Sequence, residues 1–264
     1  MTSSALADFP SPEADIIIPY GNDQEQFGEL RLPKGEGPHP VMMFIHGGCW
    51  LAPYDIKHVR QLAKAFTDEG IATWTIEFRR VGNPGGAWPG TFEDVSAAGD
   101  FLPTLAEKYN LDMNRFITAG HSAGGHLALW YANRPDEFKP RVTIPRVKGV
   151  LALAPAADLA YLHQTKACGS AVDKLMLGGP DQFPERYKLG SAIDRLPVNT
   201  PQHVILGLYD DAWTPGGMRY VNAAVTQKAP ITLTIAKQSG HFEMIDPRTS
   251  TWDLVLKAAK DLLK

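Results

Sequence analysis

The sequence is poor in cysteine and contains no long hydrophobic run. Cys49 and Cys168 are the only cysteines among 264 residues, too few for the disulfide framework of a small secreted domain. We therefore expect both thiols to be reduced and the protein to be cytoplasmic. No stretch approaches the roughly 20 apolar residues of a membrane-spanning helix, so we expect no membrane partner.

The chain also lacks an excess of positive charge. Its 26 Lys and Arg residues face 29 Asp and Glu residues, for a net charge of −3. Without a basic cluster, we expect no nucleic-acid partner. The first residues, M-T-S-S-A-L-A-D-F-P, have neither the basic start nor the apolar run of a signal peptide. No cluster of ligand-type side chains has metal-site spacing, so no metal and no cofactor are expected.

Strand-like and helix-like segments alternate along the chain. Strands are predicted at residues 15–20, 26–32, 41–45, 71–78, 116–119, 147–154, 204–208 and 231–236. Helices are predicted at residues 56–69, 92–109 (with Thr91 as N-cap), 126–133, 217–227 and 250–263. This order predicts one α/β domain over residues 1–264, with a mostly parallel sheet of about eight strands covered by helices on both faces.

Two features interrupt this pattern. No helix separates the first two strands, so they are expected to pair antiparallel. Residues 156–198 are too long for a plain connection, and we interpret them as a small lid insertion over the site. Residues 1–13 are rich in Ser and Pro and are expected to be loosely ordered.

Ser122 is the most informative residue. It lies in G-H-S-A-G, between the apolar run 116–119 and the helix-like run 126–133. A serine on a sharp strand-to-helix turn presents its hydroxyl as a nucleophile, and small residues two positions before and after let the backbones pass. Gly120 and Gly124 occupy those positions. The pattern predicts a nucleophile elbow.

A serine nucleophile needs a base and an acid that orients the base. His241 follows the last predicted strand, and we expect it to be the base. His46, His121 and His126 are expected to hold loops or helices in place. The acid should follow a strand end between serine and histidine, where Asp210 and Asp211 compete. We prefer Asp210 because its distance from the strand end is better fixed, whereas counting back from Pro215 favours Asp211.

Asp158, after another strand, is an outside candidate for the acid, and its expected role is a cap. The oxyanion hole needs backbone N–H groups: Ala123 should supply one, and Gly48 or Cys49, in H-G-G-C-W, the second. Aromatic side chains are expected to line the substrate pocket. These are Trp50, Trp88, Trp213 and Phe242.

Three segments in this order resemble the α/β-hydrolase superfamily: H-G-G-C-W (46–50), G-H-S-A-G-G-H (120–126) and S-G-H-F-E-M-I-D-P (239–247). Within it, they are similar to small carboxylesterases and kynurenine formamidase (arylformamidase)-like enzymes with an H-G-G-x-W oxyanion motif, as is E-F-R-R-V-G (77–82). The resemblance implies Ser122 as nucleophile, Asp210 as acid and His241 as base. Cys49 departs from the lipase-like H-G-G-G pattern, so that group's substrates are not carried over.

The sequence thus predicts a serine hydrolase that cleaves small carboxylic esters through an acyl-enzyme. Its partner is then a small-molecule ester or amide. Amide hydrolysis of the N-formylkynurenine type is the alternative reaction. An alternative of another class is a catalytically silent binding protein with a hydrolase fold.

Overall fold

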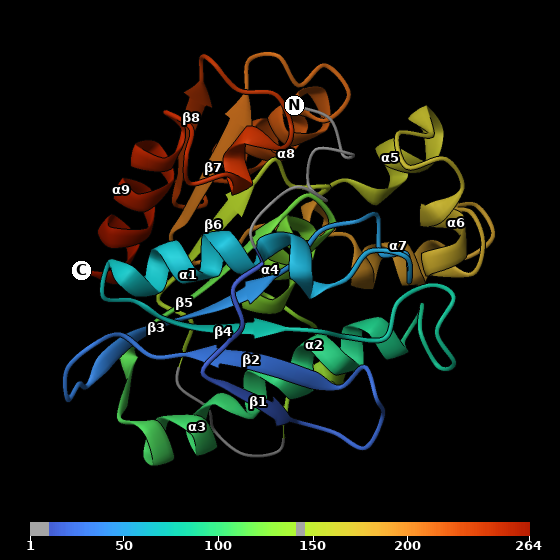
Figure 1. Cartoon of the computed structure of the whole chain (residues 1–264). Helices are drawn as coiled ribbons and strands as arrows, with labels where there is room; N and C mark the ends of the chain where they lie inside the picture. The colour runs from blue at the N-terminus through green and yellow to red at the C-terminus, as the bar shows by residue number, and fades with distance from the viewer. Residues whose placement is uncertain (1–10, 141–145) are drawn as a thin grey trace.

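An eight-stranded sheet runs through the molecule, and helices cover both of its faces (Figure 1). The computed structural model describes residues 11–140 and 146–264, so most of the N-terminus expected to be loose lies outside the described residues. The strands are β1 (Ile16–Pro19), β2 (Phe27–Arg31), β3 (His39–Ile45), β4 (Ala72–Ile76), β5 (Leu111–His121), β6 (Gly149–Leu153), β7 (Gln202–Gly207) and β8 (Ile231–Ala236).

The strand order is β1-β2-β4-β3-β5-β6-β7-β8. β1 pairs with β2 and β2 with β4 in antiparallel fashion, and all the other neighbours are parallel. The predicted α/β class, mostly parallel sheet and antiparallel first pair are therefore confirmed. Because parallel strands end at the same edge, the loops that follow β3, β5, β7 and β8 gather there.

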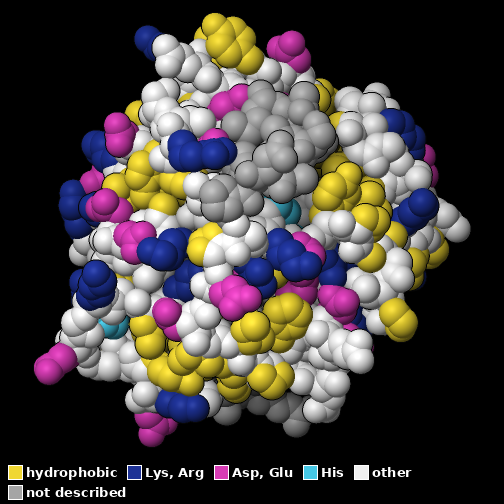
Figure 2. Space-filling model, viewed as in Figure 1, with side chains coloured by type: hydrophobic (Ala, Val, Ile, Leu, Met, Phe, Trp, Pro, Cys, Tyr) yellow, Lys and Arg dark blue, Asp and Glu magenta, His cyan; other side chains and the backbone are white. Residues whose placement is uncertain are grey.

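Side chains of β3 alternate between two cores, as the pleat of a strand requires. Met42 and Phe44 belong to a core formed with α1 (Arg60–Asp68) and α9 (Trp252–Leu263). Their neighbours Val41, Met43 and Ile45 pack on the opposite face, where the helices are α2 (Gly90–Asp100), α4 (Ala123–Ala132) and α8 (Thr214–Thr226). The sheet is thus buried on both faces. On the molecular face seen in Figure 2, positive and negative side chains are interspersed.

The helix predicted at residues 92–109 is two helices, α2 and α3 (Leu102–Tyr109), with a break at Phe101. Pro103 lies in the first turn of α3 and has no N–H to continue the helical hydrogen bonds. Thr91 is not the N-cap either. Its hydroxyl donates to the Arg79 carbonyl and accepts from the N–H of Ala87, so it joins two loops instead.

Residues 156–198 form three short helices, α5 (Leu159–Thr165), α6 (Ala171–Met176) and α7 (Pro184–Gly190), at one side of the molecule (Figure 1). This insertion is docked on α4. His126 Nε2 donates to the Gly190 carbonyl at 2.7 Å and Trp130 Nε1 to the Leu189 carbonyl at 2.8 Å. The prediction that His126 has a structural role is confirmed.

Candidate active site

Ser122 lies at the turn between β5 and α4 with φ 55° and ψ −117°, a strained conformation for a residue with a Cβ. Two glycines allow this turn. A Cβ on Gly120 would lie 2.2 Å from the carbonyl oxygen of Gly124, and one on Gly124 would lie 2.0 Å from that of Ile45. No side chain fits at either position, which accounts for the small residues of the motif.

His241 lies in the loop after β8, and its Nδ1 is 2.7 Å from Oδ2 of Asp210. The carboxylate accepts, so Nδ1 is the donor and Nε2 is the ring nitrogen that is left for other partners. Asp210 is buried, whereas Asp211 is exposed. The structure brings Asp210 rather than Asp211 to the histidine. The indole of Trp213 stacks on the imidazole, with the ring centroids 4.9 Å apart.

Asp158 is a helix cap, as expected. Its carboxylate accepts the N–H of Tyr161 in the first turn of α5, and its other oxygen pairs with Arg219 at 2.8 Å. Both oxygens are therefore engaged away from the imidazole of His241.

A cavity of about 670 Å³ opens beside these residues. Ser122, His241 and Asp210 all line it. Its other lining residues are Ser11, Gly48, Cys49, Pro53, Tyr54, Asp55, Lys57, His58, His121, Ala212, Trp213 and Phe242. A nucleophile-type serine and a histidine–carboxylate pair thus share one solvent-accessible chamber.

Of the four aromatic residues expected in the pocket, Trp213 and Phe242 line this cavity. Trp50 does not. It is buried against the ring of His126, with the ring centroids 5.5 Å apart. Trp88 packs on Phe92 instead, with the centroids 5.0 Å apart. The expectation for these two tryptophans was wrong, because a place in a loop near the sheet edge does not fix the direction of a side chain.

The loop after β3 provides backbone donors beside the serine. Gly48, Cys49 and Trp50 have φ angles of 105°, 51° and 57°, so three successive residues are left-handed. Within residues 11–140 and 146–264, no acceptor is bonded to the N–H of Gly48 or Cys49, or to that of Ala123 at the start of α4. Gly48 and Cys49 line the cavity. This arrangement suits a developing oxyanion.

A buried charged network lies behind this loop. Nε2 of His46 is 2.8 Å from Oε1 of Glu77, and that carboxylate also accepts the N–H groups of Ile56 and Phe78. Burial alone would raise the pKa of Glu77, but His46, Arg80 and the N–H of Phe78 outweigh it, and the pKa lies below its ordinary value. These hydrogen bonds connect His46, in the loop, to the buried Glu77 carboxylate and so fix the loop, which is the role predicted for His46.

His121, next to the serine, supports the other loop. Its Nε2 is 2.9 Å from the carbonyl oxygen of His241, so this nitrogen carries the proton. Burial, followed by the neighbouring imidazoles of His241 and His58, holds the pKa of His121 well below its usual value. The ring is therefore neutral, and the predicted loop-holding role of His121 is confirmed.

Sequence reasoning missed Tyr54 and His58, which line the cavity from the segment that leads into α1. Burial, with His46 nearby, lowers the pKa of His58 to about 3, so this imidazole is neutral. Neither residue belongs to a motif. The signal that could have found them is their position a few residues after H-G-G-C-W, at the same edge of the sheet.

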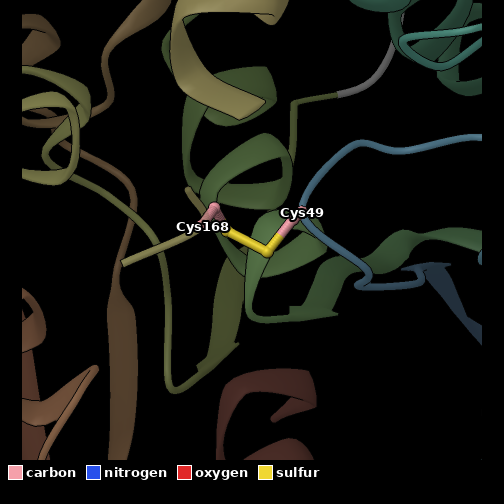
Figure 3. Close-up of a disulfide and its surroundings, with 2 residues drawn as sticks. All are labelled: Cys49 and Cys168. Atoms are coloured by element: carbon pink, nitrogen blue, oxygen red, sulfur yellow. A yellow bond between two sulfur atoms is a disulfide. The ribbon is translucent and has the colours of Figure 1, made fainter. Parts of the chain in front are cut away.

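The cysteine prediction was wrong. Cys49 and Cys168 form a disulfide with a Cα–Cα distance of 5.9 Å, although 119 residues separate them in the chain. Figure 3 shows the bond joining the loop after β3 to the connection between α5 and α6. The number of cysteines does not tell how far apart they lie in the folded chain. Here that distance is determined by the docking of the insertion.

Among the described residues, no three His, Cys, Asp or Glu side chains are grouped to hold a metal ion. No described helix is long and apolar enough to cross a membrane.

Known proteins resemble this chain in fold and sequence. Esterase B from Lactobacillus rhamnosis superposes with a TM-score of 0.83 at 19% identity, covering 98% of this chain and 90% of that one. Esterase LipC of Mycobacterium tuberculosis is 22% identical over 71% of this chain and 48% of its own length. Versiconal hemiacetal acetate esterase of Dothistroma septosporum is 33% identical over 47% of this chain and 37% of its own length.

The fold is that of the α/β-hydrolases. The chain spans less than half the length of these two curated relatives. The BD-FAE family model matches residues 29–215, well over half of the sequence, and includes the nucleophile turn and Asp210. The chain belongs to the BD-FAE family.

Proposed function

We propose that this protein is a serine esterase that hydrolyses small carboxylic esters through an acyl-enzyme intermediate. The observation that carries the proposal is the shared cavity: Ser122, on a strained turn, faces the same chamber as the hydrogen-bonded pair of His241 and Asp210. The esterases among its relatives support the same reaction class.

In this proposal, His241 Nε2 takes the hydroxyl proton as Ser122 Oγ attacks the ester carbonyl carbon. Asp210 holds Nδ1 protonated and stabilises the imidazolium that forms. The N–H groups of Ala123 and of Gly48 or Cys49 receive the negative charge on the carbonyl oxygen. The imidazolium then gives its proton to the departing alkoxide. Water, activated by the same histidine, releases the acid in the second half of the cycle.

The cavity favours short acyl chains or compact aryl groups over long lipid chains. Each buried methylene stabilises binding by about 0.8 kcal/mol only while the chain still fits. Aromatic rings of Trp213, Phe242 and Tyr54 bound a chamber of about 670 Å³. The value of kcat/KM should therefore rise over the first few carbons and then fall.

A series of p-nitrophenyl esters from acetate to palmitate tests both the reaction and this limit, with N-formylkynurenine assayed in parallel. Hydrolysis that peaks at short chains supports the proposal. Faster cleavage of N-formylkynurenine than of any ester would replace it with an arylformamidase. Rates that keep climbing to palmitate would indicate a lipase. No turnover and no reaction with a fluorophosphonate would indicate a binding protein.

The cytoplasmic location expected from the cysteine count is weakened by the disulfide, because disulfides persist in oxidising compartments. We infer that the protein works where Cys49 and Cys168 stay oxidised. Alkylation under denaturing conditions during lysis, followed by mass spectrometry of the intact protein, tests this: no alkyl adduct supports an oxidising compartment, and two adducts support the cytoplasm.

A further inference from the structure

The disulfide ends in the loop that carries the proposed oxyanion donors, and it is attached at the point where this loop is least supported. Upstream, His46 is bonded to Glu77. Downstream, the N–H of Val81 donates to the carbonyl of Trp50 at 2.8 Å. Between them, neither the N–H nor the carbonyl of Cys49 is bonded to any residue in the described part of the chain. Its Sγ–Sγ bond is the remaining tie.

Cys49 needs an additional contact because its backbone conformation is unfavourable. A residue with a Cβ in the left-handed region is strained and persists only where its surroundings enforce it. Cys49 and Trp50 are two such residues in succession. Trp50 is enforced by burial in the core, with 1% of its surface exposed. Cys49 lines the cavity instead and has open space on that side.

The other end of the bond is firmly held. Cys168 accepts the N–H of Ala171 at the start of α6. Val172, Leu175 and Met176 of this helix are buried in the core, and the carbonyl of Leu175 accepts the N–H of Trp88 at 2.7 Å. The insertion contributes none of the lining residues of the cavity, so it forms no wall of this cavity, and the disulfide is its covalent link to the loop after β3.

We propose that the disulfide between Cys49 and Cys168 is a positioning element for ester hydrolysis. It fixes the loop after β3 (residues 46–52, the oxyanion loop) against the docked insertion. This inference rests on the proposed function. The insertion acts as a brace: it holds the N–H groups of Gly48 and Cys49 in place before the substrate arrives. Donors positioned in advance stabilise the transition state more than the bound substrate. Loss of the bond should therefore lower kcat and leave KM almost unchanged.

The variant Cys168→Ser cuts the bond and leaves the backbone of the oxyanion loop unaltered. Removal of one oxyanion donor costs about a hundredfold to a thousandfold in kcat. A loosened donor should cost less, about tenfold to a hundredfold, with KM changed less than about twofold. The rates are measured well below the melting temperature of each variant with the best p-nitrophenyl ester.

Reduction provides an independent route if the variant folds poorly. Two electrons and two protons pass from dithiothreitol to the Sγ–Sγ bond, which gives two thiols and cyclic oxidised dithiothreitol. The reduced wild type should show the kcat of Cys168→Ser, and reoxidation should restore the original value. Cys168→Ser itself should not respond to dithiothreitol.

Leu263→Ala is the matched control for lost stability, because Leu263 is buried between α9 and the sheet, in the core opposite the insertion. Its kcat should equal that of the wild type. An unchanged kcat after the bond is cut, or an equal loss in Leu263→Ala, would overturn the proposal. A wild type that hydrolyses no ester and takes up no fluorophosphonate would instead overturn the proposed function on which it rests.

Discussion

The loop after β3, residues 46–52, and the loop after β8, residues 237–246, both line the cavity that Ser122 lines but are held in different ways. The first has successive left-handed residues, a buried charged network and a covalent bond to a distant segment. The second has no covalent tie; besides the carboxylates of Asp210 and Glu243, which accept from His241 and from the N–H of Gly240, neutral hydrogen bonds hold it, among them those of His121 with the His241 carbonyl and of Ser239 with Thr251.

The two loops also differ in how far their histidine side chains are exposed to solvent. The side chain of His46 is 1% exposed, whereas that of His241 is 12% exposed. Groups that stabilise an oxyanion act best when they do not move, because reorganisation during the reaction costs free energy. A base must exchange protons with the substrate and with water. The comparison teaches that the more buried and covalently tied loop is the one to which the proposed function assigns charge stabilisation, whereas the more exposed loop carries the proposed base.

The largest effect should come from the acid behind the base. Asp210→Asn should lower kcat about ten-thousand-fold, because the amide can donate to Nδ1 and so favours the wrong tautomer of His241. Asp211→Asn is the matched control. Its side chain is exposed, and we expect less than about a twofold change, typical of surface substitutions. Steady-state kinetics of both variants decide the matter, and a reversed order would make Asp211 the acid.

The second effect concerns stability and sets the two loops against each other. Glu77→Ala leaves the imidazole of His46 buried without its carboxylate partner, whereas Arg80 keeps Glu25, and should cost about 3 to 5 kcal/mol in the free energy of unfolding. Ser239→Ala removes a neutral hydrogen bond from the other loop and should cost about 1 kcal/mol. Urea unfolding measures both. Equal losses would refute the claim that the first loop depends on a charged network.

A third effect tests the support of the insertion on α4. Burial lowers the pKa of His126 to about 4, against about 6.5 in an unfolded chain. Below pH 6.5 the unfolded state takes up the proton first, so the stabilisation present above pH 6.5 is lost as the pH falls towards 4. Between pH 7 and 5 this loss should be on the order of 2 kcal/mol.

The measurement for this third effect is urea unfolding at pH 5, 6 and 7. His126→Gln keeps an N–H donor but cannot titrate, so its stability should depend less steeply on pH. The same slope in variant and wild type would show that His126 is not a source of the acid sensitivity.

The smallest effect concerns the hydrogen bond between the nucleophile turn and the loop after β8. His121→Leu removes the hydrogen bond to the His241 carbonyl, worth about 0.5 to 1.5 kcal/mol, and should lower kcat by up to about tenfold with little change in KM. His121→Gln keeps a donor and should recover part of the loss. If both variants equal the wild type in kcat, the hydrogen bond of His121 does not position His241.

Much of this architecture was readable from sequence because it depends on local patterns. The alternation of apolar runs predicted the sheet, and the small residues around Ser122 predicted the turn that the carbonyl oxygens of Ile45 and Gly124 enforce. Asp210 was preferred over Asp211 by counting from a strand end, which works because a strand fixes the positions of the residues just beyond it.

What the sequence could not provide depends on contacts between distant segments. The disulfide requires the insertion to dock on α4, and that docking uses backbone carbonyls of Leu189 and Gly190, which leave no trace in residue type. The directions of Trp50 and Trp88 follow from packing in the core, not from their place in loops. Tyr54 and His58 likewise line the cavity only because the folded chain brings their segment to the edge of the sheet.

Fluorophosphonate labelling followed by mass spectrometry of the intact protein and its peptides tests the central claim most directly. The account predicts one adduct per chain, located on the peptide that contains Ser122, and none in Ser122→Ala. Labelling should also fall sharply in Asp210→Asn. An adduct on any other residue, or an equal adduct in Ser122→Ala, would contradict the assignment of Ser122 as the nucleophile.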